Sequence, residues 1–143
     1  MRWEGPDGYW ASDDPALVDT GTVHAWMSEQ SYWANGRPLA ATVRAVENSL
    51  VIGLYAADDR QAGFARFVTD YATFAWLCDV FVDSERRGNG LGTFLVRTAV
   101  EHPALRGVRQ LLMAEPGRSI YRRHGYGPLL RPERWMERPG QVP

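Results

Sequence analysis

Residues able to carry chemistry are concentrated in two short segments of the chain. The first, Arg86 to Gly92, reads Arg-Arg-Gly-Asn-Gly-Leu-Gly and lies between an apolar run, 74–82, and an amphipathic run, 91–102. A strand, a glycine-rich turn and a helix in this order can cradle an anion, because glycines let the backbone come close and the first N–H groups of the helix face the ligand. Arginine adds a charged fork for phosphate. The segment therefore predicts a phosphate-binding cradle.

The spacing of the glycines excludes two common phosphate loops. A Walker-type loop needs Lys and then Ser or Thr after its last glycine, and this chain has no lysine. A Rossmann fingerprint with glycines at 88 and 90 needs a third at 93, where the chain has Thr93. The pattern that fits is Arg-x-x-Gly-x-Gly over 87–92. A tight turn without a ligand needs fewer than three alternating glycines, so we favour a ligand-binding loop.

The second segment, Ser119 to Tyr126, carries Tyr121 followed by the pair Gly125-Tyr126, about 34 residues after Arg87. These two motifs, in this order and spacing, resemble the acetyl-coenzyme A loop and the tyrosine helix of the GNAT acetyltransferase superfamily. The resemblance extends over about 50–126, and the chain is most similar to small bacterial single-domain members. It implies a GNAT-like fold with a mixed, mostly antiparallel sheet, a parallel pair of strands at the acetyl-CoA site and about four flanking helices.

Hydrophobic periodicity predicts a mixed α/β (α+β) chain. A strand, a helix and a strand around the cradle form a βαβ unit, which requires a parallel pair, and the antiparallel strands precede it. We expect the Pro-rich ends, 1–15 and 131–143, to be less regular, with one or two strands around Leu129 and Trp135. The expected helices are 20–30, 39–47, 91–102 and 116–124, and the expected strands are 49–56, 63–70, 74–82 and 108–114.

Composition narrows the class of protein. With 143 residues and 45% apolar residues the chain suits one folded domain, 1–143, whose best-supported core is 50–126. The net charge of -1 gives no reason to expect binding to nucleic acid or membranes. A single cysteine, Cys78, and the absence of a signal-like or membrane-length apolar run favour a cytoplasmic protein. The three histidines lack metal-ligand spacing, so we expect no metal.

The resemblance implies that acetyl-CoA is the co-substrate. It places the pantetheine arm along the backbone of Phe81 and Val82, and the pyrophosphate on backbone amides of the cradle. The implied coenzyme-binding residues are Phe81, Val82, Arg86, Arg87, Gly88, Asn89, Gly90, Leu91, Gly92 and Thr93.

Acetyl transfer to an amine also needs a neutral amine and a stabilised leaving thiolate. An alkylamine is only about one-thousandth neutral at pH 7, so a carboxylate that accepts its proton would help. Asp79 on the cradle strand is one candidate, as a base or as a purely structural carboxylate, and Asp70 is another. Relatives often have Glu where this chain has Cys78. Tyr121, whose phenol is protonated at neutral pH, is expected to be the general acid, and Tyr126 is expected to pack in the core.

Two further expectations concern the acceptor side of the reaction. Cys78 has no His partner nearby in sequence, so we interpret it as a buried apolar residue and not as a nucleophile. By resemblance, the loop after the first helix and the turn before the cradle strand border the acceptor pocket, which their aromatic content makes suitable for an apolar or aromatic amine. The candidate pocket residues are Tyr32, Trp33, Tyr71, Phe74 and Trp76.

The leading hypothesis is a cytoplasmic acetyl-CoA-dependent N-acetyltransferase that acts on the primary amine of a small molecule by direct attack. Two alternatives remain open at this point. One is acetylation of a protein or an aminoacyl-tRNA, for which Arg118, Arg122 and Arg123 could supply a basic face. The other is a non-catalytic acyl-CoA-binding sensor. Because small members of the superfamily often pair, we also expect a homodimer.

Overall fold

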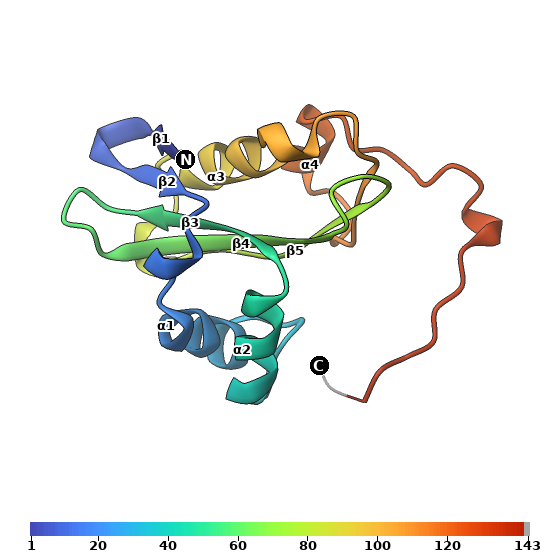
Figure 1. Cartoon of the computed structure of the whole chain (residues 1–143), viewed down its shortest axis with the longest axis horizontal. Helices are drawn as coiled ribbons and strands as arrows, with labels where there is room; N and C mark the ends of the chain where they lie inside the picture. Colours follow the sequence, from blue (N-terminus) through green and yellow to red (C-terminus); the bar gives the residue numbers. More distant parts are fainter. Residues whose placement is uncertain (142–143) are drawn as a thin grey trace.

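A computed structural model describes residues 1–141 of the chain. Its centre is a sheet of six strands that lie side by side in chain order, with helices on both faces (Figure 1). Every neighbouring pair is antiparallel except β5 and β6, which are parallel. This arrangement confirms the predicted mixed fold with one parallel pair. The strands are β1 (Arg2–Glu4), β2 (Trp10–Ser12), β3 (Leu50–Tyr55), β4 (Gln61–Thr69), β5 (Ala75–Val82) and β6 (Gln110–Leu112).

The helices form a layer on each side of the sheet. Helices α1 (Thr20–Ala25) and α2 (Leu39–Glu47) lie on one face, and α3 (Leu91–Val100) and α4 (Ser119–Arg123) lie on the other (Figure 1). Helix α2 has the predicted bounds, whereas α3 and α4 are shorter than the ranges 91–102 and 116–124. Among the residues that the structure describes, no helix has the length and apolar character needed to cross a membrane.

Alternate residues of the strands point to opposite faces of the sheet and pack into two separate apolar cores. Ile52 packs on the side of α3, while the preceding residue, Val51, packs on the side of α1 and α2. Each large apolar side chain that is fully buried in this way stabilises the fold by about 1.5–3 kcal/mol. The core under α3 includes Ile52, Phe67, Leu77, Phe94 and Leu95. The core under α1 and α2 includes Val23, Trp26, Val51, Phe64 and Phe81.

The predicted first helix, 20–30, changes its winding halfway. After α1 the chain forms a π-turn, Trp26–Gln30, in which the Ser31 amide donates to the Trp26 carbonyl at 3.0 Å. The hydroxyls of Ser28 and Ser31 donate to carbonyls four residues earlier, at 2.8 Å and 2.6 Å, and such bonds compete with regular helical pairing. The wider turn sets the start of the loop that carries Tyr32 and Trp33.

The ends of the chain differ from the expectation in opposite ways. The prediction of irregular structure over 1–15 was wrong, because β1 and β2 extend the sheet from β3. The predicted strands around Leu129 and Trp135 are not formed in the described residues, where the tail is exposed and holds only a short turn, Pro132–Arg134. Pro128 and Pro132 remove amide donors that a strand would need. The last two residues of the predicted irregular tail, 142–143, lie outside the described residues.

Candidate active site

The glycine-rich cradle lies where the sequence predicted it, between the end of β5 and the start of α3. Gly88 and Gly90 have positive φ, +95° and +74°, and the space that a Cβ would occupy at either residue is open to 4 Å. Gly90 precedes α3 without a side-chain hydrogen bond to the first turn, so the first N–H groups of the helix can meet an external anion.

Gly92 gives separate evidence for a ligand at the cradle. It lies in the first turn of α3, where glycine costs about 0.5–1 kcal/mol relative to alanine. A Cβ there would meet only Ile120 Cδ1, at 4.0 Å, an ordinary contact. Since packing does not require glycine at this position, close approach of a bound group explains it better.

The two arginines of the cradle point in different directions. Arg86 donates from Nη1 to the Tyr9 hydroxyl at 3.0 Å and lies 3.8 Å from Asp83, so it binds the N-terminal hairpin. Arg87 donates from Nε to the Val82 carbonyl at 2.9 Å, and its guanidinium lies 4.9 Å from the centre of the Phe81 ring. These contacts favour Arg87 over Arg86 as the phosphate ligand.

A cavity of about 690 Å³ lies beside the unpaired half of β5. Strands β5 and β6 pair only from Ala75–Gln110 to Leu77–Leu112. Beyond these pairs, the cavity is lined by residues 78–80 of β5, by residues 113–116, which follow β6, and by Tyr121 of α4. The predicted strand 108–114 is therefore shorter than expected because β6 loses its partner at Leu112. Beyond Leu77, β5 has no β6 partner on this edge, and it continues to the cradle.

A β-bulge in β5 sets which side chains reach the cavity. The register with β4 shifts by one residue between the pairs Phe64–Phe81 and Arg66–Cys78, and Asp79 has φ +52°. The extra residue places Cys78 and Asp79 on the same face of the sheet, which a regular strand does not allow. Sequence alternation alone does not reveal this bulge.

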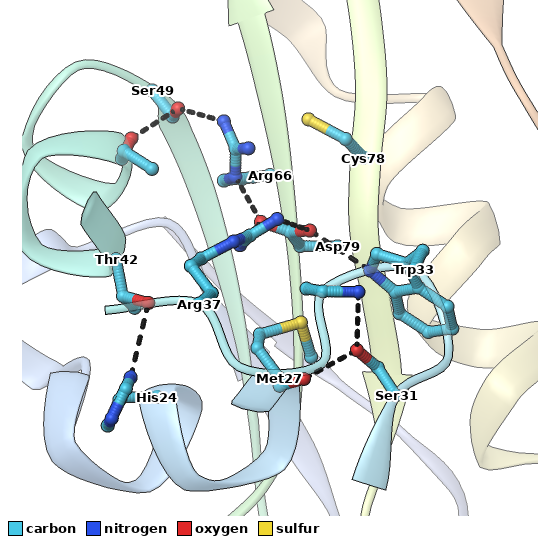
Figure 2. Close-up of polar contacts among 12 residues, drawn as sticks. His24, Met27, Ser31, Trp33, Arg37, Thr42, Ser49, Arg66, Cys78 and Asp79 are labelled. Atoms are coloured by element: carbon cyan, nitrogen blue, oxygen red, sulfur yellow. Dashed lines mark hydrogen bonds and ion pairs between the residues drawn. The ribbon is translucent and has the colours of Figure 1, made fainter. Parts of the chain in front are cut away.

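Asp79 is the centre of a buried polar cluster (Figure 2). Arg37 donates to its two oxygens from Nη1 and Nη2, at 2.8 Å and 3.2 Å, and Arg66 Nε donates to Oδ2 at 2.6 Å. Trp33 Nε1 donates to Oδ1 at 3.1 Å. These bonds tie β5 to β4 and to the loop between the π-turn and α2.

The cluster makes Asp79 a poor general base. Burial acts to raise the pKa of its carboxyl, but hydrogen bonds and charge from Arg37 and Arg66 outweigh burial and hold that pKa below its ordinary value. The carboxylate is thus weakly basic and its oxygens are already engaged. Asp70 is no better placed, because it accepts from the Thr73 hydroxyl and from backbone amides of an exposed turn, which lowers its pKa.

Tyr121 lies at the cavity with its hydroxyl protonated. The residue is half-buried, and its ring meets the Tyr126 ring edge-on at 6.2 Å. Burial raises the pKa of the Tyr121 phenol, partly opposed by the charge of Arg118. Tyr126 instead donates to Gln110 Oε1 at 2.6 Å, outside the cavity. Of the two tyrosines, Tyr121 is thus the one placed to donate a proton there.

The predicted acceptor residues divide into two groups. Tyr32, Trp33 and Trp76 line the cavity, whereas Tyr71 and Phe74 are absent from its lining and belong to the turn between β4 and β5. Sequence reasoning missed several charged lining residues: Arg37, Arg66, Arg118, Glu115 and Glu137. A charged residue inside the apolar run 62–68 could have indicated Arg66, since buried arginines need a partner.

Cys78 is half-buried and lines the cavity, so the expectation of a fully buried apolar residue was wrong. Burial raises the pKa of the thiol to about 11. A thiol that stays protonated at neutral pH is a weak nucleophile, which argues against an acetyl-cysteine intermediate. The described residues contain no group of three or more His, Cys, Asp or Glu side chains that could hold a metal ion.

Comparison with known proteins gives the same family by sequence and by structure. Residues 48–128 match the family model of the acetyltransferase (GNAT) domain. A protein from Gibberella zeae assigned as an acetyltransferase is 30% identical over an alignment of 115 residues, with coverage of 68% of this chain and 64% of that protein. The chain thus spans slightly less than two thirds of the length of this curated relative.

Solved structures of the same fold include a close match in length. A crystal structure from Xanthomonas campestris pv. campestris, described as belonging to the GNAT family, is 40% identical, covers 95% of this chain and 96% of its own, and has a TM-score of 0.89. A Clostridium acetobutylicum structure solved with acetyl-CoA shares the fold at 16% identity, with a TM-score of 0.65 and coverage of 97% and 96%. The chain belongs to the GNAT family of acetyltransferases.

Proposed function

We propose that this protein is an acetyl-CoA-dependent N-acetyltransferase that acts on the primary amine of a small molecule. The observation that carries the proposal is that β5 has the glycine cradle at its end and, beside its half that β6 does not pair, a cavity lined by Tyr121. We further propose that 1–143 forms one catalytic domain.

In this proposal the cradle and β5 hold the coenzyme. Backbone amides of Gly88 to Thr93 and the guanidinium of Arg87 would bind the pyrophosphate. Arg87 would then release the Val82 carbonyl, and the backbone of Phe81 and Val82 would pair with the pantetheine arm. Bound acetyl-CoA supplies an acetyl group activated as a thioester. The residues fit, because the φ values of Gly88 and Gly90 and the open space around them leave room for phosphate.

The side chains of the cavity then have separate roles. Tyr121 donates its proton to the leaving thiolate. Asp79 is a positioning residue that holds Arg37, Arg66 and Trp33. Proton removal from the amine would pass through solvent to Glu115, a cavity-lining carboxylate that forms no ion pair with any described residue.

A thiol-release assay tests this function. Purified protein with acetyl-CoA is offered a panel of small amines, a lysine-containing peptide and an aminoacyl-tRNA. Release of thiol with a small amine supports the proposal, and release with only the peptide or the tRNA would replace it with the corresponding macromolecular acceptor. Tight coenzyme binding without turnover of any acceptor would indicate a non-catalytic sensor.

Substitution of Gly90 by valine is expected to abolish measurable coenzyme A binding. The new side chain would fill the open space at the start of α3, and valine is strained at φ +74°. Isothermal titration calorimetry with coenzyme A measures the effect. Gly107→Val is the matched control, because Gly107 has φ +77° and equally open surroundings in a turn after α3. Equal affinity of the two variants for coenzyme A would contradict the cradle.

We also propose that the protein is a homodimer in solution. The tail exposes Leu130, Trp135 and Met136, at 81%, 43% and 95%, and β6 ends the sheet of the described residues with an unpaired edge. A second copy could cover both features. Sedimentation equilibrium at micromolar concentration is expected to give twice the chain mass of 16.1 kDa, and a single-chain mass would refute the dimer.

A further inference from the structure

The floor of the acceptor cavity combines two guanidinium groups with one carboxylate. Arg37, Arg66 and Asp79 all line the cavity, with side chains 10%, 12% and 4% exposed. Their other charged neighbours in the lining, Glu115, Arg118 and Glu137, are exposed residues at its rim. Among the residues that the structure describes, the shielded part of the cavity therefore has two positive groups and one negative group, and low exposure strengthens their effect on a bound ligand.

Arg66 has donor capacity left over on this floor. Its Nε donates to Asp79 Oδ2 at 2.6 Å and its Nη1 donates to Ser49 Oγ at 3.1 Å (Figure 2). None of the described residues accepts a hydrogen bond from Nη2, and a guanidinium carries five N–H donors in a planar fork. Because Asp79 and Ser49 fix the side chain, Arg66 can bind an anionic oxygen without first losing conformational freedom.

We propose that the acceptor amine also carries a carboxylate, and that this carboxylate binds Arg66 while the amine faces Tyr121. The inference rests on the proposed function and names the substrate class of that site as an amino acid or a close analogue. Arg66 supplies the direct contact, and Arg37, which donates to the same Asp79 oxygen, adds a second positive charge (Figure 2).

The cluster favours a carboxylate over a phosphate. The two N–H groups of Arg66 Nη2 can be satisfied by one carboxylate, whereas a phosphate has three anionic oxygens that need donors. The walls of the cavity indicate which side chain the acceptor carries besides its amine and carboxylate. Trp33 and Trp76 line the same cavity with 37% and 42% of their surfaces exposed, which suits an apolar or aromatic side chain stacked between them and the anion site.

The test uses pairs of amines that differ only in the carboxylate. These are phenylalanine with 2-phenylethylamine, tryptophan with tryptamine, and alanine with ethylamine, and kcat/KM is measured for each. For the wild-type protein we expect at least one aromatic pair to be accepted, with the amino acid preferred. In Arg66→Gln, kcat/KM for the amino acid should fall by about 10- to 100-fold, while that for the matching amine should change by less than about threefold.

Two features keep the result interpretable if Arg66→Gln is partly unfolded. The ratio of kcat/KM for the two members of a pair is taken in one sample, so an inactive fraction cancels. Arg60→Gln removes the same charge from an exposed hairpin, where Arg60 pairs with Asp58 outside the cavity, and should leave the ratio unchanged. Arg66→Lys keeps the charge without the fork, so the ratio should lie between those of the wild type and Arg66→Gln.

The outcomes separate the inference from the proposed function. Equal use of both members of every pair, or equal losses for both in Arg66→Gln, would overturn the carboxylate site while leaving the acetyltransferase intact. Preference for phosphoethanolamine over ethanolamine, with no preference for any amino acid, would overturn it in favour of a phosphate. Absence of turnover with every amine, in protein that binds coenzyme A, would reject the proposed function and the substrate class together.

Discussion

Replacement of Tyr121 by phenylalanine is expected to lower the rate of acetyl transfer by about 10²- to 10⁴-fold. The substitution keeps the ring that packs against Tyr126 and removes only the hydroxyl of a residue that lines the cavity. Folding and coenzyme A affinity should therefore be unchanged. Single-turnover rates with an accepted amine measure the effect, because they exclude product release.

Tyr126→Phe is the matched control for this experiment. Tyr126 lies five residues further along, and its hydroxyl donates to Gln110 instead of facing the cavity. Loss of that hydrogen bond should cost about 1 kcal/mol of stability and leave turnover near the wild-type rate. A Tyr121→Phe variant as active as Tyr126→Phe would mean that water, or another group, protonates the thiolate. Burial raises the pKa of Tyr121 above 10, the ordinary pKa of tyrosine. The phenol should therefore deprotonate, and the wild-type rate fall for that reason, only at pH values above 10.

The largest effect on stability is expected for Asp79→Asn, which should lower the free energy of unfolding by about 3–5 kcal/mol at pH 7. The substitution leaves Arg37 and Arg66 beside a neutral amide in a buried site. Asparagine tolerates the backbone φ of +52°, so the loss reports the charge and not backbone strain. Urea unfolding measures it, and Asp58→Asn, which breaks an exposed ion pair with Arg60, should change the midpoint very little.

The pH dependence of stability in the wild type and in Asp79→Asn gives a second test. Because the folded pKa of Asp79 is depressed, its contribution to stability is complete above the ordinary carboxyl pKa of 3.8 and is lost as the pH falls towards the lower folded value. The stability difference between wild type and Asp79→Asn should therefore be constant near neutral pH and shrink below about pH 4. A difference that stays unchanged down to pH 2 would show that the Asp79 charge is not responsible.

The sequence predicted those elements whose signals are local. The cradle, α2 and strands β3 to β5 each follow from a run of residues that contains its own glycine, capping or periodicity signal. Of the residues that the sequence placed in one pocket, Tyr32, Trp33 and Trp76 line a common cavity, and Tyr71 and Phe74 do not. The roles of these residues stay predictions, since they depend on ligands that only the experiments above can test.

The features that the sequence did not predict depend on contacts between distant segments. Arg37 and Arg66 bind Asp79 although they lie 42 and 13 residues before it in the sequence, and no periodic pattern links these positions. The pairing of β2 with β3 brings together Trp10 and Tyr55, whose rings stack at 4.5 Å, so a Pro-rich N-terminus still forms strands. For the C-terminal tail the error was the reverse. Its apolar residues suggested strands, which Pro128 and Pro132 do not allow.

The bulge in β5 also constrains how the gene can vary. Loss of the codon for Asp79 would restore regular alternation and keep the pairs Phe64–Phe81 and Arg66–Cys78, so Leu77 would stay in the core under α3. The carboxylate that Arg37 and Arg66 bind would be lost, and the polar cluster with it. Substitutions in β5 change one contact at a time, whereas a one-residue deletion outside the bulge would exchange the inside and outside of part of the strand. Length variation among close relatives should accordingly fall in the hairpin 57–60 and spare 78–80.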